Sequence, residues 1–271
     1  MKYTSSRLIC FSPTHSSHLI GESIIRGLDP QDLTETDLTY EKPDGTVDVS
    51  DDITVIVVPV YGGRVPLTAL ERMENIRGNG LPVIPVVVYG NRDYEDALLE
   101  LKDWCIAHNF LPIAAAAFIG EHSYSRPGRP IAEGRPNGND LQIAKQFGKK
   151  IAEKSSDTKE LNAIAPWKVK GNFPYKERGT KTPQTPVTIA ELCTQCGLCI
   201  GICPVGAIRL ENEVVSEADV CIKCCACVKY CPNEARVFDT PYTDMLFRNF
   251  KYPRVPELFY CWNFSCPRIR P

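Results

Sequence analysis

The chain has 271 residues, of which 43% are hydrophobic and 24% charged, and its 31 Lys and Arg nearly balance its 33 Asp and Glu. This balance gives no field strong enough to indicate nucleic acid or an anionic membrane as a partner, and no apolar run is long enough for a membrane-spanning helix. The N-terminus MKYTSSRLICFSP lacks the basic start and long apolar stretch of a secretion signal. We therefore expect a cytoplasmic protein, with two domains as the prior for this length.

The first half of the chain alternates short apolar runs with longer mixed segments, as in an α/β domain. Several runs are rich in Val and Ile, which is typical of strands buried on both faces of a parallel sheet. The expected strands are RLICF, DLTY, ITVIVVPV, PVIPVVVY and PIAAAAFIG, at 7–11, 37–40, 53–60, 82–89 and 112–120. The expected helices are 17–28, 68–77, 94–109 and 139–154. Residues 1–154 are thus predicted to form a doubly wound domain with a five-stranded parallel sheet.

The loop after the first strand is rich in hydroxyl groups and opens a helix. In a doubly wound fold the ligand lies outside the carboxyl ends of the strands, so the segments that follow strands are the informative ones. The hydroxyls belong to Ser12, Thr14, Ser16 and Ser17. Together with the free N–H groups of a helix start they suit a phosphate, although simple capping of the helix would need only one of them.

Two further loops at the same edge of the sheet combine glycines with tyrosines. Glycines let the backbone approach a flat ligand, and aromatic rings can cover its faces, although a tyrosine near a turn is more often ordinary packing. The residues are Tyr61, Gly62 and Gly63 after the third strand, and Gly90, Asn91 and Tyr94 after the fourth. The segment after the fifth strand is expected to cap the site through His122 or Tyr124.

The cysteines are concentrated in the C-terminal third. Of thirteen cysteines, nine lie between Cys193 and Cys231, although reducing conditions in the cytoplasm disfavour disulfides. The region contains CTQCGLCIGICP and, 28 residues later, CIKCCACVKYCP, so each half reads C-x2-C-x2-C-x3-C-P. An internal repeat of this kind indicates two similar metal centres.

The cysteine spacing assigns ligands to two [4Fe-4S] clusters. Three thiolates at two-residue intervals can bind three corners of one cluster, whereas the fourth cysteine of each motif reaches the other cluster. The first ligand set is Cys193, Cys196, Cys199 and Cys231, and the second is Cys221, Cys224, Cys227 and Cys203. A zinc site is the alternative, but zinc needs four thiolates per ion and no third cysteine at this rhythm. We interpret the additional thiol of Cys225 as a spectator.

Residues 2–154 resemble flavodoxins. The phosphate loop of that family reads [S/T]-x-[S/T]-G-x-[S/T], and SPTHSS at 12–17 matches it except that His15 stands where glycine is usual. The resemblance implies bound FMN, with Tyr61 and Tyr94 at the positions whose rings flank the isoalloxazine. It also implies close backbone approaches at Gly62, Gly63, Gly90 and Asn91. His15 would either crowd the phosphate or donate a hydrogen bond to it.

Residues 190–239 resemble the bacterial two-cluster ferredoxins, which implies a small α+β module and one-electron transfer at low potential. Together the two resemblances are those of the flavodoxin-ferredoxin fusion proteins of anaerobes, whose partners would be redox proteins such as a reductase or an acceptor oxidoreductase. The domain prediction is a flavodoxin-like domain at 1–154, a linker at 155–188, a ferredoxin domain at 189–238 and a tail at 239–271.

The linker and the tail carry aromatic residues that are unusual for free segments. We expect part of the linker to pack on one of the domains through Trp167, Phe173 and Tyr175. The tail is expected to lie over the flavodoxin-like domain or over a second subunit, in which case the chain forms a homodimer. Its thiols, Cys261 and Cys266, are too few for a cluster.

The preferred function is electron transfer between FMN, the two clusters and redox partners. The alternative is an FMN-dependent reductase of a small substrate fed by the clusters, but no catalytic residue set is evident. A third interpretation, prompted by His15, is a redox sensor or scaffold whose flavin site has decayed.

Overall fold

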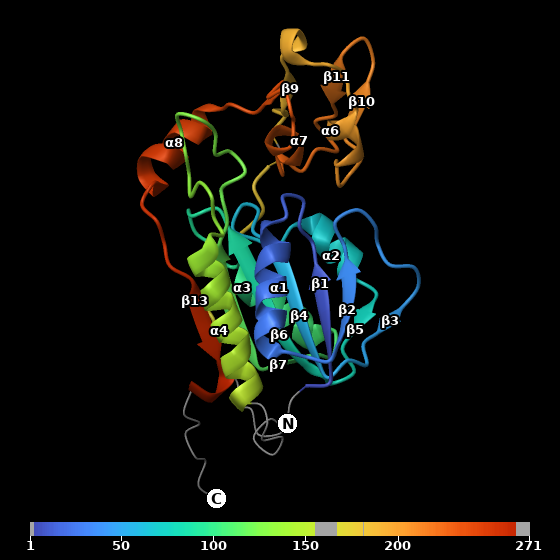
Figure 1. Ribbon diagram of the computed structural model, residues 1–271, viewed down its shortest axis with the longest axis vertical. Coiled ribbons are helices and arrows are strands. Elements are labelled where there is room, and N and C mark those ends of the chain that lie inside the picture. The colour runs from blue at the N-terminus through green and yellow to red at the C-terminus, as the bar shows by residue number, and fades with distance from the viewer. Residues whose placement is uncertain (1–2, 155–166, 181, 264–271) are drawn as a thin grey trace, which may run out of the picture.

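The computed structural model describes residues 3–154, 167–180 and 182–263. A larger α/β lobe contains the N-terminal half, and a smaller lobe from the C-terminal third lies beyond the carboxyl ends of its strands (Figure 1). Within the described ranges no helix is both long and apolar enough to cross a membrane.

The central sheet of the larger lobe has five parallel strands in the order β2, β1, β4, β6, β8. Their bounds are β1 (Ser5–Cys10), β2 (Asp32–Asp37), β4 (Ile53–Pro59), β6 (Pro82–Tyr89) and β8 (Ala114–Ile119). Counted along the chain, this is the strand order 2-1-3-4-5 of the flavodoxin-like fold. The predicted five-stranded parallel sheet is therefore confirmed, and a short β7 (Leu111–Pro112) also pairs with β6.

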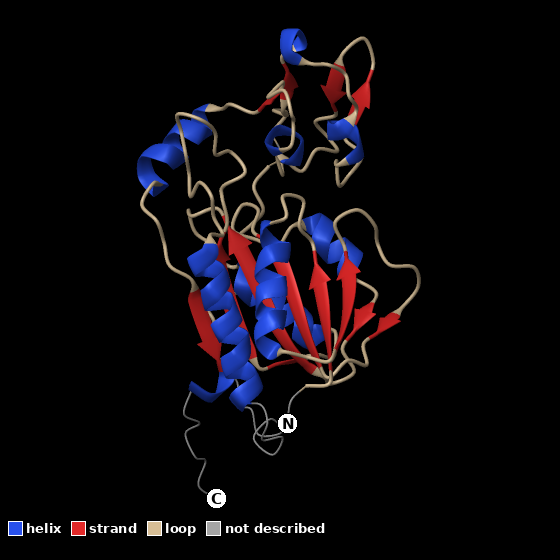
Figure 2. Cartoon of the chain, viewed as in Figure 1, coloured by secondary structure: helices blue, strands red, loops and turns tan. Residues whose placement is uncertain are grey.

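Helices cover both faces of this sheet (Figure 2). The helices are α1 (Ser16–Leu28), α2 (Leu67–Met73), α3 (Ala97–Ala107) and α4 (Gly138–Lys154). Apolar residues of α1 and α4 are buried in one core with one face of the strands, and those of α2 and α3 in a second core with the other face. The near-continuous apolar runs of β4, β6 and β8 follow from this burial on both sides.

Two predicted elements are placed differently. The strand expected at 37–40 is β2 at Asp32–Asp37, because the edge strand is largely exposed and polar, while the apolar signal of Leu38 comes from a buried residue just beyond its end. The helix expected at 68–77 ends at Met73, because Ile76–Arg77 forms a strand, β5, that pairs in parallel with β3 (Val47–Asp48).

The α1–α4 contact depends on two glycines. A Cβ atom added to Gly27 would lie 2.0 Å from the Lys145 carbonyl oxygen, and one added to Gly148 would lie 2.1 Å from the Ile24 carbonyl oxygen. Real Cβ atoms do not approach backbone oxygen atoms so closely. The two helix backbones can therefore touch only because both positions lack a side chain.

Replacing Gly148 by alanine is expected to destabilise the protein by about 1–3 kcal/mol, the usual cost of overpacking a well-packed core. Urea unfolding followed by far-UV circular dichroism measures this change. Gly138→Ala is the matched control, because Gly138 begins the same helix and faces open space. A Gly148→Ala protein as stable as this control would contradict the close helix contact.

The smaller lobe is a repeat of two half-sites with little regular structure. Its elements are β9 (Val187–Thr188), a 3-10 turn η1 (Ala190–Leu192), α6 (Leu198–Gly201), β10 (Ile208–Leu210), β11 (Val214–Ser216), α7 (Ala226–Lys229) and β12 (Arg236–Val237). β10 pairs with β11, and β9 pairs with β12, in both cases antiparallel. This arrangement is the small α+β module that the cysteine repeat predicts.

The described part of the connecting segment packs on the larger lobe through Trp167 and Tyr175, as expected, whereas Phe173 is 79% exposed. Trp167 is buried, and its indole N–H donates to the Pro112 carbonyl at 3.1 Å. The Tyr175 hydroxyl donates to Asp103 at 2.6 Å, near α3. The predicted boundary at 155 lies outside the described residues, as do positions 155–166 and 181.

The tail returns to the larger lobe and extends its sheet. After α8 (Pro241–Phe250), β13 (Glu257–Tyr260) pairs antiparallel with the free edge of β8, and a 3-10 turn, η2 (Cys261–Asn263), follows. This added edge strand was not predicted, although the expectation that the tail lies over this domain is confirmed. Cys261 packs against the core, whereas Cys266 lies outside the described residues.

Candidate functional site

A cavity of about 310 Å³ opens at the carboxyl ends of the parallel strands, a volume at the lower end of the range for small-molecule sites. All three loops singled out in the sequence reach it. The predicted residues that line it are Ser12, Thr14, Ser16, Ser17, Tyr61, Gly62, Gly63 and Gly90. The cavity therefore brings the hydroxyl-rich loop and the glycine-tyrosine loops to one place.

The hydroxyl-rich loop is held in a defined shape at the start of α1. The Ser12 hydroxyl accepts a hydrogen bond from the His18 N–H at 3.1 Å, and the Ser12 N–H donates to the Thr39 hydroxyl at 2.9 Å. His15 has φ of 63°, the left-handed conformation that glycine adopts without strain. Its ring stacks on His18 at 4.7 Å and is not part of the cavity lining. His15 thus takes the backbone shape expected of glycine while its side chain points elsewhere.

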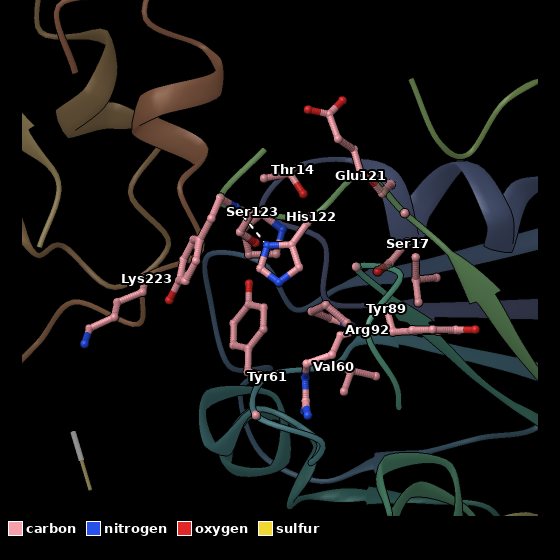
Figure 3. A pocket seen from close by; sticks show the side chains of 18 of the residues that line it. Thr14, Ser17, Val60, Tyr61, Tyr89, Arg92, Glu121, His122, Ser123 and Lys223 are labelled. Atoms are coloured by element: carbon pink, nitrogen blue, oxygen red, sulfur yellow. Dashed lines mark hydrogen bonds between the residues drawn. The ribbon is translucent and has the colours of Figure 1, made fainter. Parts of the chain in front are cut away.

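Aromatic side chains stand in the middle of the cavity. Figure 3 shows the rings of Tyr61 and His122 there, with the amino group of Lys223 directed away. The His122 ring lies against Gly90, where an added Cβ would come within 2.5 Å of it, and its edge faces Tyr124 at 5.1 Å between ring centres. Gly90 is therefore required by the packing of His122 as much as by any ligand.

Tyr94 and Asn91, which were predicted as cofactor contacts, are not among the residues that line the cavity. Tyr94 is buried and its hydroxyl donates to Glu257 at 2.6 Å; burial and this carboxylate raise the pKa of Tyr94. The Asn91 amide donates to the carbonyl oxygens of Phe250 and Tyr252. Both side chains anchor the tail, which sequence patterns alone did not place.

Several lining residues were not predicted. They include Tyr89, Arg92, Ser123, Ile222, Lys223 and Tyr242, whereas His122 and Tyr124 were expected as a cap. Tyr89 is the last residue of β6, and Arg92 and Ser123 lie within four residues after a strand end, so their position relative to the strands could have indicated them. Ile222, Lys223 and Tyr242 come from the smaller lobe and the tail, and no local signal points to them.

The cysteines of the smaller lobe form two groups. A small cavity of about 20 Å³ is lined by Cys193, Cys196, Cys199 and Cys231, so the last cysteine of the second motif lies with three from the first. Within the described residues no three metal-binding side chains surround a single-ion site. A four-iron cluster takes one thiolate at each corner, so its ligands enclose a space and do not converge on one ion.

Backbone N–H groups donate to cysteine sulfurs in both groups. The N–H of Ala235 donates to Cys231 Sγ at 3.3 Å, and the N–H of Ala207 donates to Cys203 Sγ at 3.2 Å. Burial, together with neighbouring thiols such as that of Cys203, raises the pKa of the Cys224 thiol to about 12. Because metal ligation requires the thiolate, these sites favour a group that supplies positive charge. The donor set therefore fits a cluster.

Cys225 occupies the position that Gly197 holds in the first motif. Both residues have left-handed backbone conformations, with φ of 60° and 78°. The Cys225 thiol is buried and donates to the Lys223 carbonyl at 3.6 Å, and burial raises its pKa. Its assignment as a spectator stays a prediction.

Charged and apolar contacts join the two lobes beside the cavity. Lys229 donates to Glu121 at 2.7 Å, and Arg72 donates to the carbonyl oxygen of Pro204 at 2.6 Å. Ile222 packs against the core on one face of the sheet. The motif that begins at Cys221 therefore faces the cavity.

Residues 186–209 and 218–240 each match a family model described as a 4Fe-4S binding domain. Each segment contains one complete cysteine motif. The smaller lobe is therefore a ferredoxin-type domain with two 4Fe-4S sites. No curated protein matches the chain.

Flavodoxins are among the similar solved structures. A flavodoxin from the domain Archaea is 14% identical, with a TM-score of 0.42 over 56% of this chain and 99% of its own. A Streptococcus pneumonia TIGR4 flavodoxin is 16% identical, with a TM-score of 0.40 over 55% of this chain and 99% of its own. Oxidised flavodoxin 1 from Bacillus cereus is 12% identical, with a TM-score of 0.41 over 55% and 98%.

The chain joins a flavodoxin-like domain, defined by its strand order, to a ferredoxin-type domain. This combination supports a role in electron transfer.

We predict that His122 makes stability depend on pH. Burial, with smaller contributions from Lys229 and Arg92, lowers the pKa of His122 to about 4, whereas an unfolded histidine titrates near 6.5. As pH falls, the unfolded state therefore takes up the proton before the folded state does. The stability that depends on neutral His122 is fully present above about pH 6.5 and is lost as pH falls toward 4. Relative to His122→Gln, the wild type should lose about 2 kcal/mol of unfolding free energy between pH 7 and pH 5.

Urea unfolding of both proteins across this pH range measures the difference. Parallel pH profiles for the wild type and His122→Gln would show that the imidazole is not held neutral.

Proposed function

We propose that the protein is an electron carrier that holds FMN in the cavity at the carboxyl ends of the sheet and exchanges electrons between FMN and two [4Fe-4S] clusters. The observation that carries this proposal is that Ile222 and Lys223, inside the second cysteine motif, line the same cavity as the loop at 12–17. A flavin bound there would lie beside cluster ligands of the same chain. FMN, when bound, supplies exchange of one or two electrons, and each cluster exchanges one.

The hydroxyl-rich loop is the proposed phosphate site. Thr14, Ser16 and Ser17 line the cavity, and α1 begins at Ser16 with thirteen residues of regular helix. The N-cap residue His15 makes no side-chain capping bond. The Ser12 hydroxyl takes the His18 N–H, so the N–H groups of Ser16 and Ser17 and the positive end of the helix dipole are the ones proposed to face the anion. The left-handed backbone at His15 keeps the loop open without directing the imidazole at the phosphate.

Tyr61 and His122 are the proposed contacts of the flavin ring. Tyr61 stands in the cavity as the resemblance to flavodoxins implies, whereas Tyr94 does not reach it. The lowered pKa keeps His122 neutral near pH 7, so it offers a flat, uncharged surface to a ring system. Tyr124 and Tyr242 also line the cavity, with their ring centres 6.2 Å apart.

The proposed cluster ligands are the two crossed sets. Cys193, Cys196, Cys199 and Cys231 would hold one cluster, and Cys221, Cys224, Cys227 and Cys203 the other. The shared cavity of the first set and the N–H donors to Cys203 and Cys231 support this assignment.

The two clusters would act in a fixed order. The set that includes Cys221 faces the flavin cavity, since Ile222 and Lys223 line it. Cys224 and Cys227 are buried, whereas Cys196 in the other set is exposed. We therefore place the Cys221 cluster next to FMN and the Cys193 cluster toward a redox partner protein. The proposed units are a flavodoxin-like domain (1–154), a linker (155–188), a ferredoxin domain (189–238) and a tail (239–271).

Removing a phosphate-loop hydroxyl should weaken FMN binding. Thr14→Ala and Ser16→Ala are each expected to raise the FMN Kd by about 10- to 100-fold, because a hydrogen bond to a charged group contributes about 1.5–3 kcal/mol. Fluorescence titration of the apoprotein with FMN measures the Kd. Ser50→Ala is the control, because Ser50 is exposed and precedes the start of β4, at the end of the strand that lies away from the cavity. An unchanged FMN Kd in both loop variants would show that the phosphate does not bind at this loop.

Anaerobic purification with iron and flavin analysis tests the proposed function as a whole. We expect about eight irons per chain from two four-iron clusters, and FMN at one equivalent after reconstitution. Reduction by NADPH or NADH should then require an added reductase protein. Failure to bind FMN would favour a decayed flavin site, and zinc in place of iron would overturn the cluster assignment.

A second cavity supports the alternative function, an FMN-dependent reductase of a small substrate. It measures about 640 Å³, adjoins the flavin cavity through Tyr61, Tyr124 and Tyr242, and extends to Pro66 and Arg178. A small substrate there would lie beside the flavin. If this alternative holds, the reduced protein is reoxidised by a small molecule with no acceptor protein present.

A further inference from the structure

Arg236 is a buried arginine at the centre of the ferredoxin-type domain. Arg236 is the first residue of β12 and is 2% exposed. The guanidinium donates to the Thr188 hydroxyl at 2.6 Å, to the Pro186 carbonyl at 3.0 Å and to the Ser216 hydroxyl. These acceptors are all neutral, and the Arg236 Nε has no hydrogen-bond partner.

Two other poorly exposed arginines have carboxylate partners, whereas the half-buried Arg72 donates to backbone carbonyl oxygens, among them that of Pro204. Arg64 pairs with Glu100, and Arg135 pairs with Asp140. Within the described residues, Arg236 forms no ion pair with a carboxylate. Burial of an unpaired charge is unfavourable, so a counter-charge is expected beside Arg236.

The sulfur atoms that face Arg236 belong to both proposed ligand sets, and they would be thiolates once they bind iron. One guanidinium nitrogen lies 3.9 Å from Cys227 Sγ, in the set next to the flavin cavity. The same side chain lines the small cavity with Cys193, Cys199 and Cys231, in the other set. Arg236 therefore stands between the two proposed cluster sites and borders each.

We propose that the Arg236 guanidinium is a fixed counter-charge shared by both clusters and that it raises their reduction potentials. The inference rests on the proposed ligand sets. Reduction adds one electron to a cluster, with no bond made or broken and no proton required, so the cluster gains one negative charge. A permanent positive charge 3.9 Å from a ligand sulfur stabilises the reduced form of the cluster more than the oxidised form. Because Arg236 is buried, mobile ions screen this interaction little.

A purely structural role would look different in substitution experiments. Arg236 joins β12 to β9 and β11 through its bonds to Thr188 and Ser216, so its loss also removes a clamp. Glutamine is neutral yet still donates hydrogen bonds, whereas lysine keeps the charge but lacks the planar fork of arginine. If Arg236 acts as a counter-charge, the Gln and Lys variants should have different cluster reduction potentials. If Arg236 acts only as a structural clamp, their potentials should be the same.

The test is a redox titration of the full-length, cluster-loaded protein followed by electron paramagnetic resonance. We expect Arg236→Gln to lower the potentials of both clusters, with at least a tenfold fall in the reduced-to-oxidised ratio at a fixed potential, which equals 59 mV for a one-electron couple. Arg236→Lys should stay near the wild-type potentials. Arg209→Gln is the control, because exposed Arg209 pairs with Glu211 and Glu217 and should leave both potentials unchanged.

Iron analysis of each protein precedes the titration. Wild-type potentials in an iron-replete Arg236→Gln protein would overturn the inference, as would equal shifts in the Gln and Lys variants. If the Gln variant loses its iron, the Lys variant decides: wild-type potentials support the counter-charge and lowered potentials overturn it. A wild-type protein without two clusters would instead overturn the ligand sets of the proposed function.

Discussion

The ion pair between Lys229 and Glu121 holds the second cysteine motif over the carboxyl ends of the parallel sheet. The Arg72 bond to Pro204 and the packing of Ile222 on the sheet core act at the same junction. Parallel strands leave a ligand crevice at this end, and in this chain the ferredoxin-type domain forms part of its wall. The cavity is therefore formed by both domains, and the proposed exchange of electrons between FMN and the clusters would depend on this contact.

Charge compensation organises the ferredoxin-type domain in a similar way. Burial raises the pKa of Cys227 to about 11, while Arg236 pulls it down, so buried sulfur needs nearby positive charge to ionise. Cluster iron would supply positive charge there when bound, and backbone N–H groups such as that of Ala235 contribute partial charge. The domain has a small apolar core around Ile208 and Val214, so the clusters are expected to stabilise its fold as well as carry electrons.

Sequence reasoning performed best where a local pattern has one physical cause. The cysteine repeat and the apolar runs of β4, β6 and β8 allowed prediction of the two modules and their order. It failed where the cause is distant: β2 is a polar edge strand. The contacts of Tyr94 and Asn91 with a tail that joins the sheet more than 150 residues later also have no local signal. Ile222 is a variable position inside the cysteine motif, so the sequence does not indicate that it lines the cavity. Its place there follows only from the contact between the two domains.

Electron transfer within a single chain tests the account most directly. With FMN and both clusters bound, the flavin is reduced by a light flash under anaerobic conditions, and cluster reduction is followed by its visible absorbance. The account predicts a first-order rate that does not change with protein concentration, because flavin and clusters share one cavity wall. A rate that rises in proportion to protein concentration would show transfer between separate molecules, and would contradict the placement of the flavin beside the Cys221 motif.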